Sequence, residues 1–314
     1  MKTTDPDHDG VAILHPEYRA ALGQLPNFAL SDETLAVMRS SIGAMPFSPS
    51  GRTTHEDHAV PGGVTVRVHR PVRTTGVLPC IYAIHGGGYV MGSYEILDAR
   101  FDDWCPRFDC VGVSVSYRLA PEHPFPAGLD DSHAGLAWVH EHAGELGIDP
   151  DRIGIQGTSA GGGLAAALAQ YERDTGGVPI RFQLLECPML DDRRVTPSSR
   201  LDQLAVWSRE SNEYGWKSYL GARYGHDDVP AHAAPARATD LSGLPPAFVG
   251  VGGADGFRDE DVAYALRLMQ AGVPTELHVY PGAPHGAQII PGSAVNQQWE
   301  RDAADWVLRQ LATP

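Results

Sequence analysis

Short apolar runs alternate with helix-like stretches along most of the chain, from about residue 64 onward. Residues 64–71 alternate apolar and polar positions with a period of two, which is typical of a half-exposed strand. Runs rich in β-branched residues predict further strands at 80–85, 111–117, 152–157, 247–253 and 276–282. Helical patterns separate these runs, at roughly 93–108, 130–146, 159–174, 259–271 and 294–312. We therefore expect an α/β fold with a mostly parallel sheet and helices on both of its faces.

The last helical pattern has well-defined boundaries. A Pro-Gly-Ser stretch precedes it and a Thr-Pro pair follows it, and both are ordinary limits of a helix. Its apolar side chains Val295, Trp299, Trp306 and Leu311 lie near one face. We expect that face to pack on the sheet.

Two segments interrupt the alternation of strands and helices. Residues 1–50 look helical, with turns around Pro26 and Pro46, and residues 191–225 follow a strand candidate at 180–188. The second segment carries four large aromatic side chains: Trp207, Tyr214, Trp216 and Tyr219. We interpret both segments as a helical cap over the carboxyl edge of the sheet, where open α/β sheets bind ligands. The alternative is a surface excursion whose aromatic side chains pack on one another.

The length and composition fit one large α/β domain with such a cap. A chain of 314 residues can bury a large core, which we assign to residues 51–190 and 226–314. The formal net charge of −15 disfavours nucleic acid and anionic membranes as partners. The N-terminal stretch lacks the apolar core of a signal peptide, and no run approaches the ~18 apolar residues of a membrane span. We therefore expect a cytoplasmic protein with no nucleic-acid partner and no membrane insertion.

The four cysteines are Cys80, Cys105, Cys110 and Cys187. They form no Cys-x-x-Cys pair, and their spacing in a chain of this length indicates reduced, partly buried thiols. A disulfide between Cys105 and Cys110 is the alternative.

A candidate nucleophile lies where the strand pattern at 152–157 meets the helical pattern that follows. Residues 157–161 read Gly-Thr-Ser-Ala-Gly, the Gly-x-Ser-x-Gly pattern of a nucleophile elbow in its strand–turn–helix context. Ser159 must then adopt a backbone conformation that is uncommon for a non-glycine residue, so small neighbours are needed. The alternative is an alanine-rich packed helix with Ser159 as its N-cap.

An upstream glycine run favours the elbow. His85-Gly86-Gly87-Gly88 follows directly on a predicted strand, and three successive glycines there suit neither a strand nor a helix. A loop that turns its amide groups toward Ser159 would supply half of an oxyanion hole. A flexible hairpin is the alternative, but it does not explain why the glycines stand at the end of a strand.

A serine nucleophile also needs a base and a carboxylate that orients the base, in the chain order Ser, Asp or Glu, His. Asp255 stands nearest to a strand end, whereas the acids at 259–261 fall in the first turn of the next helix. His285 lies in a Pro/Gly loop just past the last strand, whereas His278 lies inside that strand. We therefore predict Ser159 as nucleophile, His285 as general base and acid, and Asp255 as the orienting carboxylate.

Five separated motifs together resemble the hormone-sensitive-lipase-like branch of the α/β-hydrolase esterases. They are HGGGY at 85–89, YRLAPEHPFPA at 117–127, GTSAG at 157–161, DGFRDE at 255–260 and HG at 285–286. The resemblance implies an eight-stranded α/β-hydrolase sheet with a helical cap. Thr158, where many relatives carry Asp, together with the stretch CPMLDDR at 187–193, points to a sub-branch whose members commonly form homodimers.

The resemblance also implies roles for single residues. The amide groups of Gly87, Gly88 and Ala160 would hold the oxyanion, and no metal or cofactor would be needed. Arg118 and Glu122 would brace loops near the site. The aromatic residues of the cap, rather than the resemblance, suggest small, apolar, short-to-medium-chain carboxylic esters as substrates, in a pocket walled by Tyr89, Trp207 and Phe257. The alternatives are an amidase or arylacetamide-type deacetylase, and a non-catalytic ligand receptor on the same fold.

Overall fold

The computed structural model describes residues 10–22, 29–42, 47–202, 204–290 and 292–312. In these ranges an eight-stranded sheet has the order β1-β2-β4-β3-β5-β6-β7-β8. The first two pairings, β1 with β2 and β2 with β4, are antiparallel, and all the others are parallel. The strands are β1 (Thr53–Val60), β2 (Val64–Pro71), β3 (Leu78–Ile84), β4 (Val111–Ser116), β5 (Ile148–Thr158), β6 (Gln183–Glu186), β7 (Ala247–Gly252) and β8 (Thr275–Tyr280). The predicted mostly parallel sheet is confirmed.

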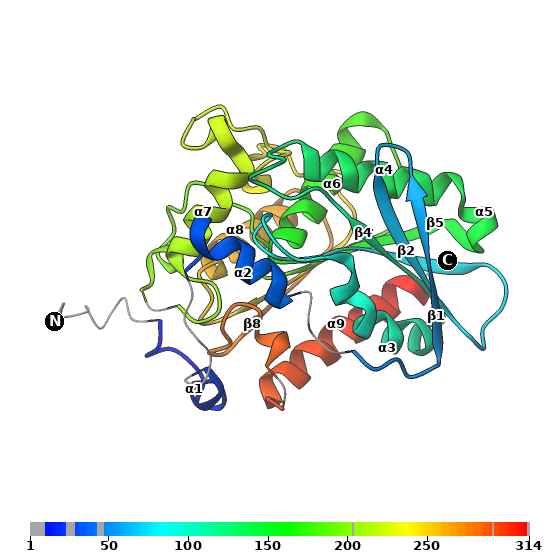
Figure 1. The fold of residues 1–314 in the computed structure, drawn as a ribbon, viewed down its shortest axis with the longest axis horizontal. Coiled ribbons are helices and arrows are strands. Elements are labelled where there is room, and N and C mark those ends of the chain that lie inside the picture. The colour runs from blue at the N-terminus through cyan, green and yellow to red at the C-terminus, as the bar shows by residue number, and fades with distance from the viewer. Residues whose placement is uncertain (1–9, 23–28, 43–46, 203, 291, 313–314) are drawn as a thin grey trace.

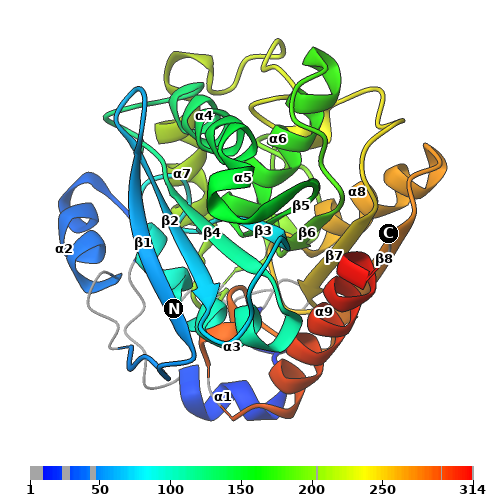
Figure 2. The ribbon, with the colours of Figure 1, turned by 90° about the vertical axis from the view of Figure 1, so that its right-hand side faces the viewer.

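Helices cover the sheet on both faces, as Figure 2 shows. One buried cluster lies under α4, α6 and α8, and a second lies under α3 and α9. The helices are α1 (Pro16–Leu22), α2 (Asp32–Ile42), α3 (Asp98–Phe108), α4 (Ala127–Glu141), α5 (Ala143–Leu146), α6 (Ala160–Thr175), α7 (Arg209–Leu220), α8 (Arg258–Gln270) and α9 (Ala294–Ala312). This is the doubly covered arrangement that the alternating pattern predicts.

Helix α9 buries the face that its sequence predicts. Trp299, Trp306 and Leu311 are buried, and Val295 packs against the same cluster. The ring of Trp299 stacks on Tyr280 with centroids 4.4 Å apart, which attaches the helix to β8.

Strand β1 carries no hydrophobic signal, and the sequence pattern does not predict it. Its residues read TTHEDHAV, and Val60 at its end is the one buried side chain. It pairs along its whole length with β2, which supplies the buried, alternating side of the hairpin. A polar edge strand of this kind is specified by its partner rather than by its own periodicity.

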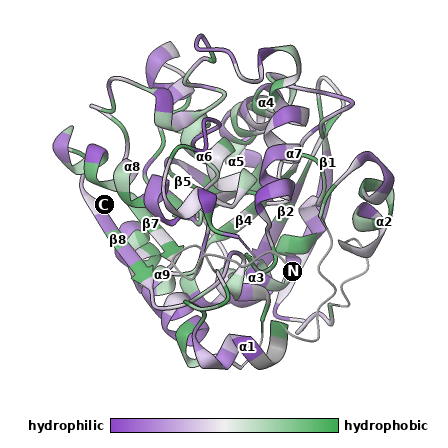
Figure 3. Cartoon of the chain, turned by 90° about the vertical axis from the view of Figure 1, so that its left-hand side faces the viewer, coloured by the Kyte–Doolittle hydropathy of each residue, from purple (hydrophilic) through white to green (hydrophobic). Residues whose placement is uncertain are grey.

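Three helices gather at one end of the molecule. In Figure 1, α1, α2 and α7 lie on the left, and Figure 3 looks onto that end. Helices α1 and α2 precede the sheet, and α7 belongs to the long connection between β6 and β7. They belong to the two segments that the sequence assigns to a cap; residues 1–9, 23–28, 43–46 and 203 of those segments lie outside the described ranges.

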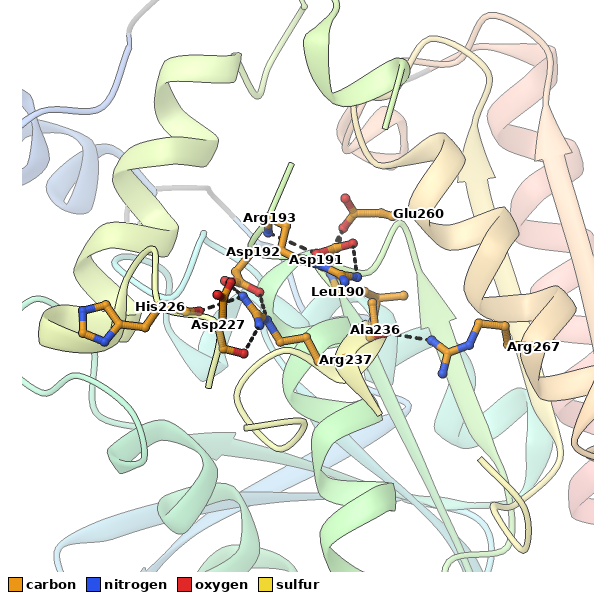
Figure 4. A network of polar contacts seen from close by, with 10 residues as sticks. All are labelled: Leu190, Asp191, Asp192, Arg193, His226, Asp227, Ala236, Arg237, Glu260 and Arg267. Atoms are coloured by element: carbon orange, nitrogen blue, oxygen red, sulfur yellow. Dashed lines mark hydrogen bonds and ion pairs between the residues drawn. The ribbon is translucent and has the colours of Figure 1, made fainter. Parts of the chain in front are cut away.

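The two ends of that long connection are joined by a polar network, shown in Figure 4. Asp192, near its start, pairs with Arg237 near its end through two contacts of 2.6 and 2.9 Å. The buried Glu260 of α8 accepts hydrogen bonds from the backbone amides of Leu190 and Asp191 at 2.9 and 3.1 Å. Because the Asp192 side chain is only 2% exposed, loss of Arg237 would leave a buried charge without its partner at the base of the connection.

All four cysteines are free and buried, as the spacing predicts. None of the helices in the described ranges combines the length and the apolar character that crossing a membrane requires.

Candidate active site

The turn between β5 and α6 carries Ser159 in an unusual conformation. Its φ is 58° and its ψ is −123°, a combination that non-glycine residues rarely adopt. The turn can form because the residues on either side of Ser159 are small. A Cβ on Gly157 would come within 2.1 Å of the Gly161 carbonyl oxygen. The structure therefore gives residues 157–161 the strained strand–turn–helix geometry that the motif predicts.

Ser159, His285 and Asp255 are brought together from three strand ends. The Ser159 hydroxyl lies 2.9 Å from Nε2 of His285, and Nδ1 of His285 lies 2.7 Å from Oδ2 of Asp255. The second carboxylate oxygen of Asp255 accepts the amide hydrogen of Phe257 at 2.9 Å. Because a carboxylate only accepts, Nδ1 carries the proton in this arrangement, and Nε2 is left to accept from the hydroxyl.

This chain of hydrogen bonds is shielded from solvent. Ser159 is 6% exposed, His285 is 5% exposed and Asp255 is 1% exposed. In such a low-dielectric setting each hydrogen bond and charge acts more strongly than it would in water.

The glycine loop after β3 lies directly against the serine turn. A Cβ on Gly86 would come within 2.8 Å of the Thr158 carbonyl oxygen. Gly87 and Gly88 have φ angles of 125° and 61°, which side-chain-bearing residues rarely adopt. Ala160 is the first residue of α6, so its amide has no partner within the helix. The three amides predicted for the oxyanion hole thus come from two segments that are packed together beside Ser159.

The three side chains predicted for the pocket lie in different settings. Phe257 meets the His285 ring edge-on, with centroids 4.9 Å apart. Trp207 lies 6.2 Å from the same ring, and its indole covers Gly88 so closely that a Cβ there would come within 2.1 Å of it.

Tyr89 stacks on Tyr219 of α7 with centroids 3.9 Å apart. The Tyr89 hydroxyl donates to the Met189 carbonyl at 2.9 Å. Tyr89 therefore joins the glycine loop to α7, whereas Trp207 and Phe257 flank His285.

A buried ion pair is hydrogen-bonded to the serine turn. Glu186, at the end of β6, is paired with Arg100 of α3. Its carboxylate accepts from the Thr158 hydroxyl at 3.2 Å, and its backbone carbonyl accepts from the Ser159 amide at 2.9 Å. These partners are distant in sequence, and no local pattern identifies Glu186 or Arg100. Thr158, which the sequence marks only as a sub-branch signature, here takes part in holding the turn.

One group of side chains within the described ranges places three potential metal-ligand atoms within 4.8 Å: Cys187, Asp255 and His285. The last two are already hydrogen-bonded to each other. Burial and the neighbouring Asp255 carboxylate raise the pKa of the Cys187 thiol well above its usual value. The geometry of this group is thus accounted for by a hydrogen-bonded acid–imidazole pair beside a neutral thiol.

His85, which opens the glycine loop, is a buried neutral imidazole. Its ring stacks on Tyr117 at 4.2 Å, and burial lowers its pKa to about 4. An unfolded histidine has a pKa near 6.5, so between these values the unfolded chain binds a proton that the folded chain does not. Folding stability is therefore lost as the pH falls from about 6.5 toward 4.

We expect the His85→Gln variant to show a weaker acid destabilisation than the parent protein. From pH 7.5 to pH 5, His85 should account for about 2 kcal/mol of the fall in the free energy of unfolding. Urea unfolding of both proteins at the two pH values measures the difference, and all other titrating groups are common to both. An identical pH dependence in the two proteins would show that His85 does not titrate in this way.

Comparisons with known proteins find a matching family model and similar esterases. A family model described as the alpha/beta hydrolase fold matches residues 81–289. Carboxylesterase NlhH of Mycobacterium tuberculosis is 39% identical over 247 residues, which are 74% of this chain and 74% of that protein. Esterase LipI of the same organism is 40% identical over 228 residues, or 68% of each chain. The solved structure of a bacterial heroin esterase is 40% identical, covers 96% of this chain and 99% of its own, and superposes with a TM-score of 0.92.

Proposed function

This chain belongs to the α/β-hydrolase family, in its hormone-sensitive-lipase-like carboxylesterase branch, and we propose that it hydrolyses carboxylic esters through an acyl-enzyme on Ser159. The observation that carries the proposal is the continuous hydrogen-bonded chain from the Ser159 hydroxyl through His285 to Asp255. A hydroxyl in contact with a base, which is in turn oriented by a carboxylate, is the arrangement that acyl transfer requires.

In the proposed acylation step, Ser159 Oγ attacks the carbonyl carbon of the ester. Its proton passes to Nε2 of His285, and Asp255 stabilises the imidazolium that forms. The carbonyl oxygen becomes negatively charged, and the amides of Gly87, Gly88 and Ala160 are positioned to donate to it. Collapse of this intermediate breaks the bond to the alcohol oxygen, which takes the proton from His285 as it leaves.

Deacylation repeats the sequence with water as the nucleophile. His285 Nε2 removes a proton from a water molecule, whose oxygen attacks the acyl carbon bound to Ser159. When the second intermediate collapses, the proton returns to Ser159 and the free carboxylic acid leaves. The same three side chains serve both halves, and neither step needs a further cofactor.

The proposed pocket is formed by the cap and the walls around His285. We propose that the N-terminal segment 1–50 and the insertion 191–225 form the cap, because Arg39 of the first binds Val90 of the glycine loop and Trp207 of the second lies beside His285. The buried Trp207 and Phe257 make the surroundings of His285 aromatic and apolar. Such walls favour short-to-medium acyl chains without charge.

A panel of p-nitrophenyl esters, from acetate to dodecanoate, tests this proposal. We expect measurable kcat/KM values that are highest for the shorter acyl chains, and slower hydrolysis of the matched p-nitroanilides. Faster cleavage of the anilides would identify an amidase instead. Tight binding of an ester without turnover would identify a ligand receptor and overturn the esterase proposal.

We also propose a cytoplasmic homodimer, following the sequence resemblance. The support is the edge strand β8, with the exposed Val279, and the exposed Leu266 and Met269 of α8, the helix that packs on β8. An open edge strand with an exposed apolar side chain is a surface on which another chain can pair. Sedimentation velocity would contradict the dimer if it gave the mass of a single chain at micromolar concentration.

A further inference from the structure

Helix α2, in the N-terminal segment, makes an unusually specific contact with the rest of the molecule. Leu35 is the one buried side chain of α2 among those that the structure describes, so little apolar packing attaches it. Arg39 extends from its last turn instead. The Nε atom of Arg39 donates to the Val90 carbonyl at 2.7 Å, and Nη2 donates to the Ala120 carbonyl at 2.9 Å.

The same guanidinium is held by a carboxylate. Nη1 and Nη2 of Arg39 each lie 2.7 Å from an oxygen of Glu122, which makes a two-pronged ion pair. Arg39 lowers the pKa of Glu122 to about 2, so the pair stays ionised throughout the neutral range. One side chain therefore makes four hydrogen bonds to three groups, which is one more than the three donors of a lysine could make.

One acceptor of Arg39, the Val90 carbonyl, belongs to the glycine loop of the proposed oxyanion hole, and the other two, on Ala120 and Glu122, belong to a second loop bonded to it. The amides of Val90 and Met91 donate to the Gly87 carbonyl at 3.1 and 3.0 Å, and this closes a tight turn over Gly88. The Ala120 amide donates to the Tyr89 carbonyl at 2.9 Å, which joins the second loop to this turn. Arg39 binds the carbonyl of the Val90–Met91 peptide, whose amide closes the turn, and the carbonyl of Ala120, whose own amide is bonded to Tyr89.

Helix α2 is also attached to α7. The Leu30 amide donates to the Ser211 hydroxyl at 3.1 Å, and the Tyr214 hydroxyl donates to Asp32 at 2.8 Å. Helix α7 in turn stacks Tyr219 on Tyr89 of the same turn. The turn is therefore held between two helices that are themselves linked.

We propose that Arg39 is a positioning residue that fixes the 87–91 turn, so that the N-terminal helix sets the geometry of the oxyanion hole. Gly87 and Gly88 have a wide choice of backbone conformations, and an external constraint is needed to keep their amides aimed at one point. Arg39 does not touch the reacting atoms and acts through Val90 and Ala120. The effect on catalysis rests on the esterase function proposed above, whereas the constraint on the turn does not.

The test compares Arg39→Lys and Arg39→Gln with the parent protein. Lysine keeps the charge, but its single nitrogen carries three donors and cannot reproduce the four hydrogen bonds of the planar guanidinium. We expect kcat to fall between about 10-fold and 100-fold in both variants, with KM changed by less than about threefold, because the lost interactions serve the transition state. Hydrogen exchange at the amides of Val90 and Met91 should become at least about tenfold faster.

A matched control comes from the same N-terminal segment. Arg19 of α1 also donates to two backbone carbonyls, those of Leu14 and Ala12, but both belong to its own segment. Arg19→Lys should leave kcat and the exchange of the turn unchanged.

Three outcomes would overturn the proposal: an unchanged kcat in both Arg39 variants, a rise in KM alone, or faster exchange spread evenly over the whole sheet. The last would indicate general destabilisation. Exchange at the turn is measured without substrate, so it tests the constraint even if no ester is hydrolysed. Absence of turnover in the parent protein would instead contradict the esterase proposal.

Discussion

The Ser159→Ala variant is expected to lose about 10⁶-fold in kcat on p-nitrophenyl acetate while it remains folded. The reason is that the hydroxyl is the atom that would form the acyl-enzyme, and His285 has no other nucleophile within hydrogen-bonding distance of Nε2 in the described chain. The substitution removes one oxygen from a site that is only 6% exposed, so the backbone turn needs no rearrangement. Steady-state hydrolysis and the far-ultraviolet spectrum, recorded on the same preparation, separate loss of activity from loss of fold.

Two aspartate variants sharpen this test. Asp255→Asn should lower kcat about 10⁴-fold, because an amide at this position favours the wrong tautomer of His285. Asp259→Asn is the matched control: the carboxylate of Asp259 accepts from the Ser198 amide at 2.7 Å and pairs with Arg258, away from His285. Near-normal activity in Asp255→Asn together with a large loss in Asp259→Asn would contradict the assignment of Asp255 as the orienting acid.

The candidate site could be predicted from sequence because each of its parts is locally encoded. The serine turn needs Gly157 and Gly161 beside it, and the glycine loop needs conformations that other residues avoid. His285 and Asp255 stand in loops just after strands, and in a parallel sheet these strand ends lie at one edge. Local chemistry and chain order were therefore sufficient to predict that these residues share one site.

The contacts that support the site could not be predicted in this way. Arg39 and Val90 are remote in sequence, as are Trp207 and Gly88, and no periodicity relates the members of either pair. Strand β1 escaped prediction for a different reason, since its side chains are mostly polar and exposed, and its register comes from its pairing with β2. Sequence pattern reports burial and backbone demands, whereas contacts between distant polar groups depend on the complete fold.

The Gly161→Ala variant is expected to lose both stability and activity. A Cβ on Gly161, at the start of α6, would come within 2.1 Å of the Ile84 carbonyl oxygen and 2.5 Å of the His85 carbonyl oxygen. Both carbonyl oxygens are backbone atoms, at the end of β3 and the start of the glycine loop. They cannot relieve the clash by a change of rotamer, as a side chain could. The helix must retreat from the strand, and we expect this to cost about 3 kcal/mol of unfolding free energy.

The retreat of α6 should also disturb the proposed chemistry, because Ser159 and Ala160 move with the helix while Gly87 and Gly88 stay with β3. A displacement of about 1 Å between the attacking oxygen and the oxyanion donors is enough to reduce kcat about 100-fold. Urea unfolding and steady-state kinetics measure the two effects, with Gly144→Ala in α5 as the control, since a Cβ there meets no atom within 4 Å. The control should be neutral or stabilised by up to about 1 kcal/mol. Unfolding of Gly161→Ala at the same urea concentration as the parent protein, with an unchanged kcat, would contradict the prediction. That result would show that the close approach of α6 to β3 is not required for stability or activity.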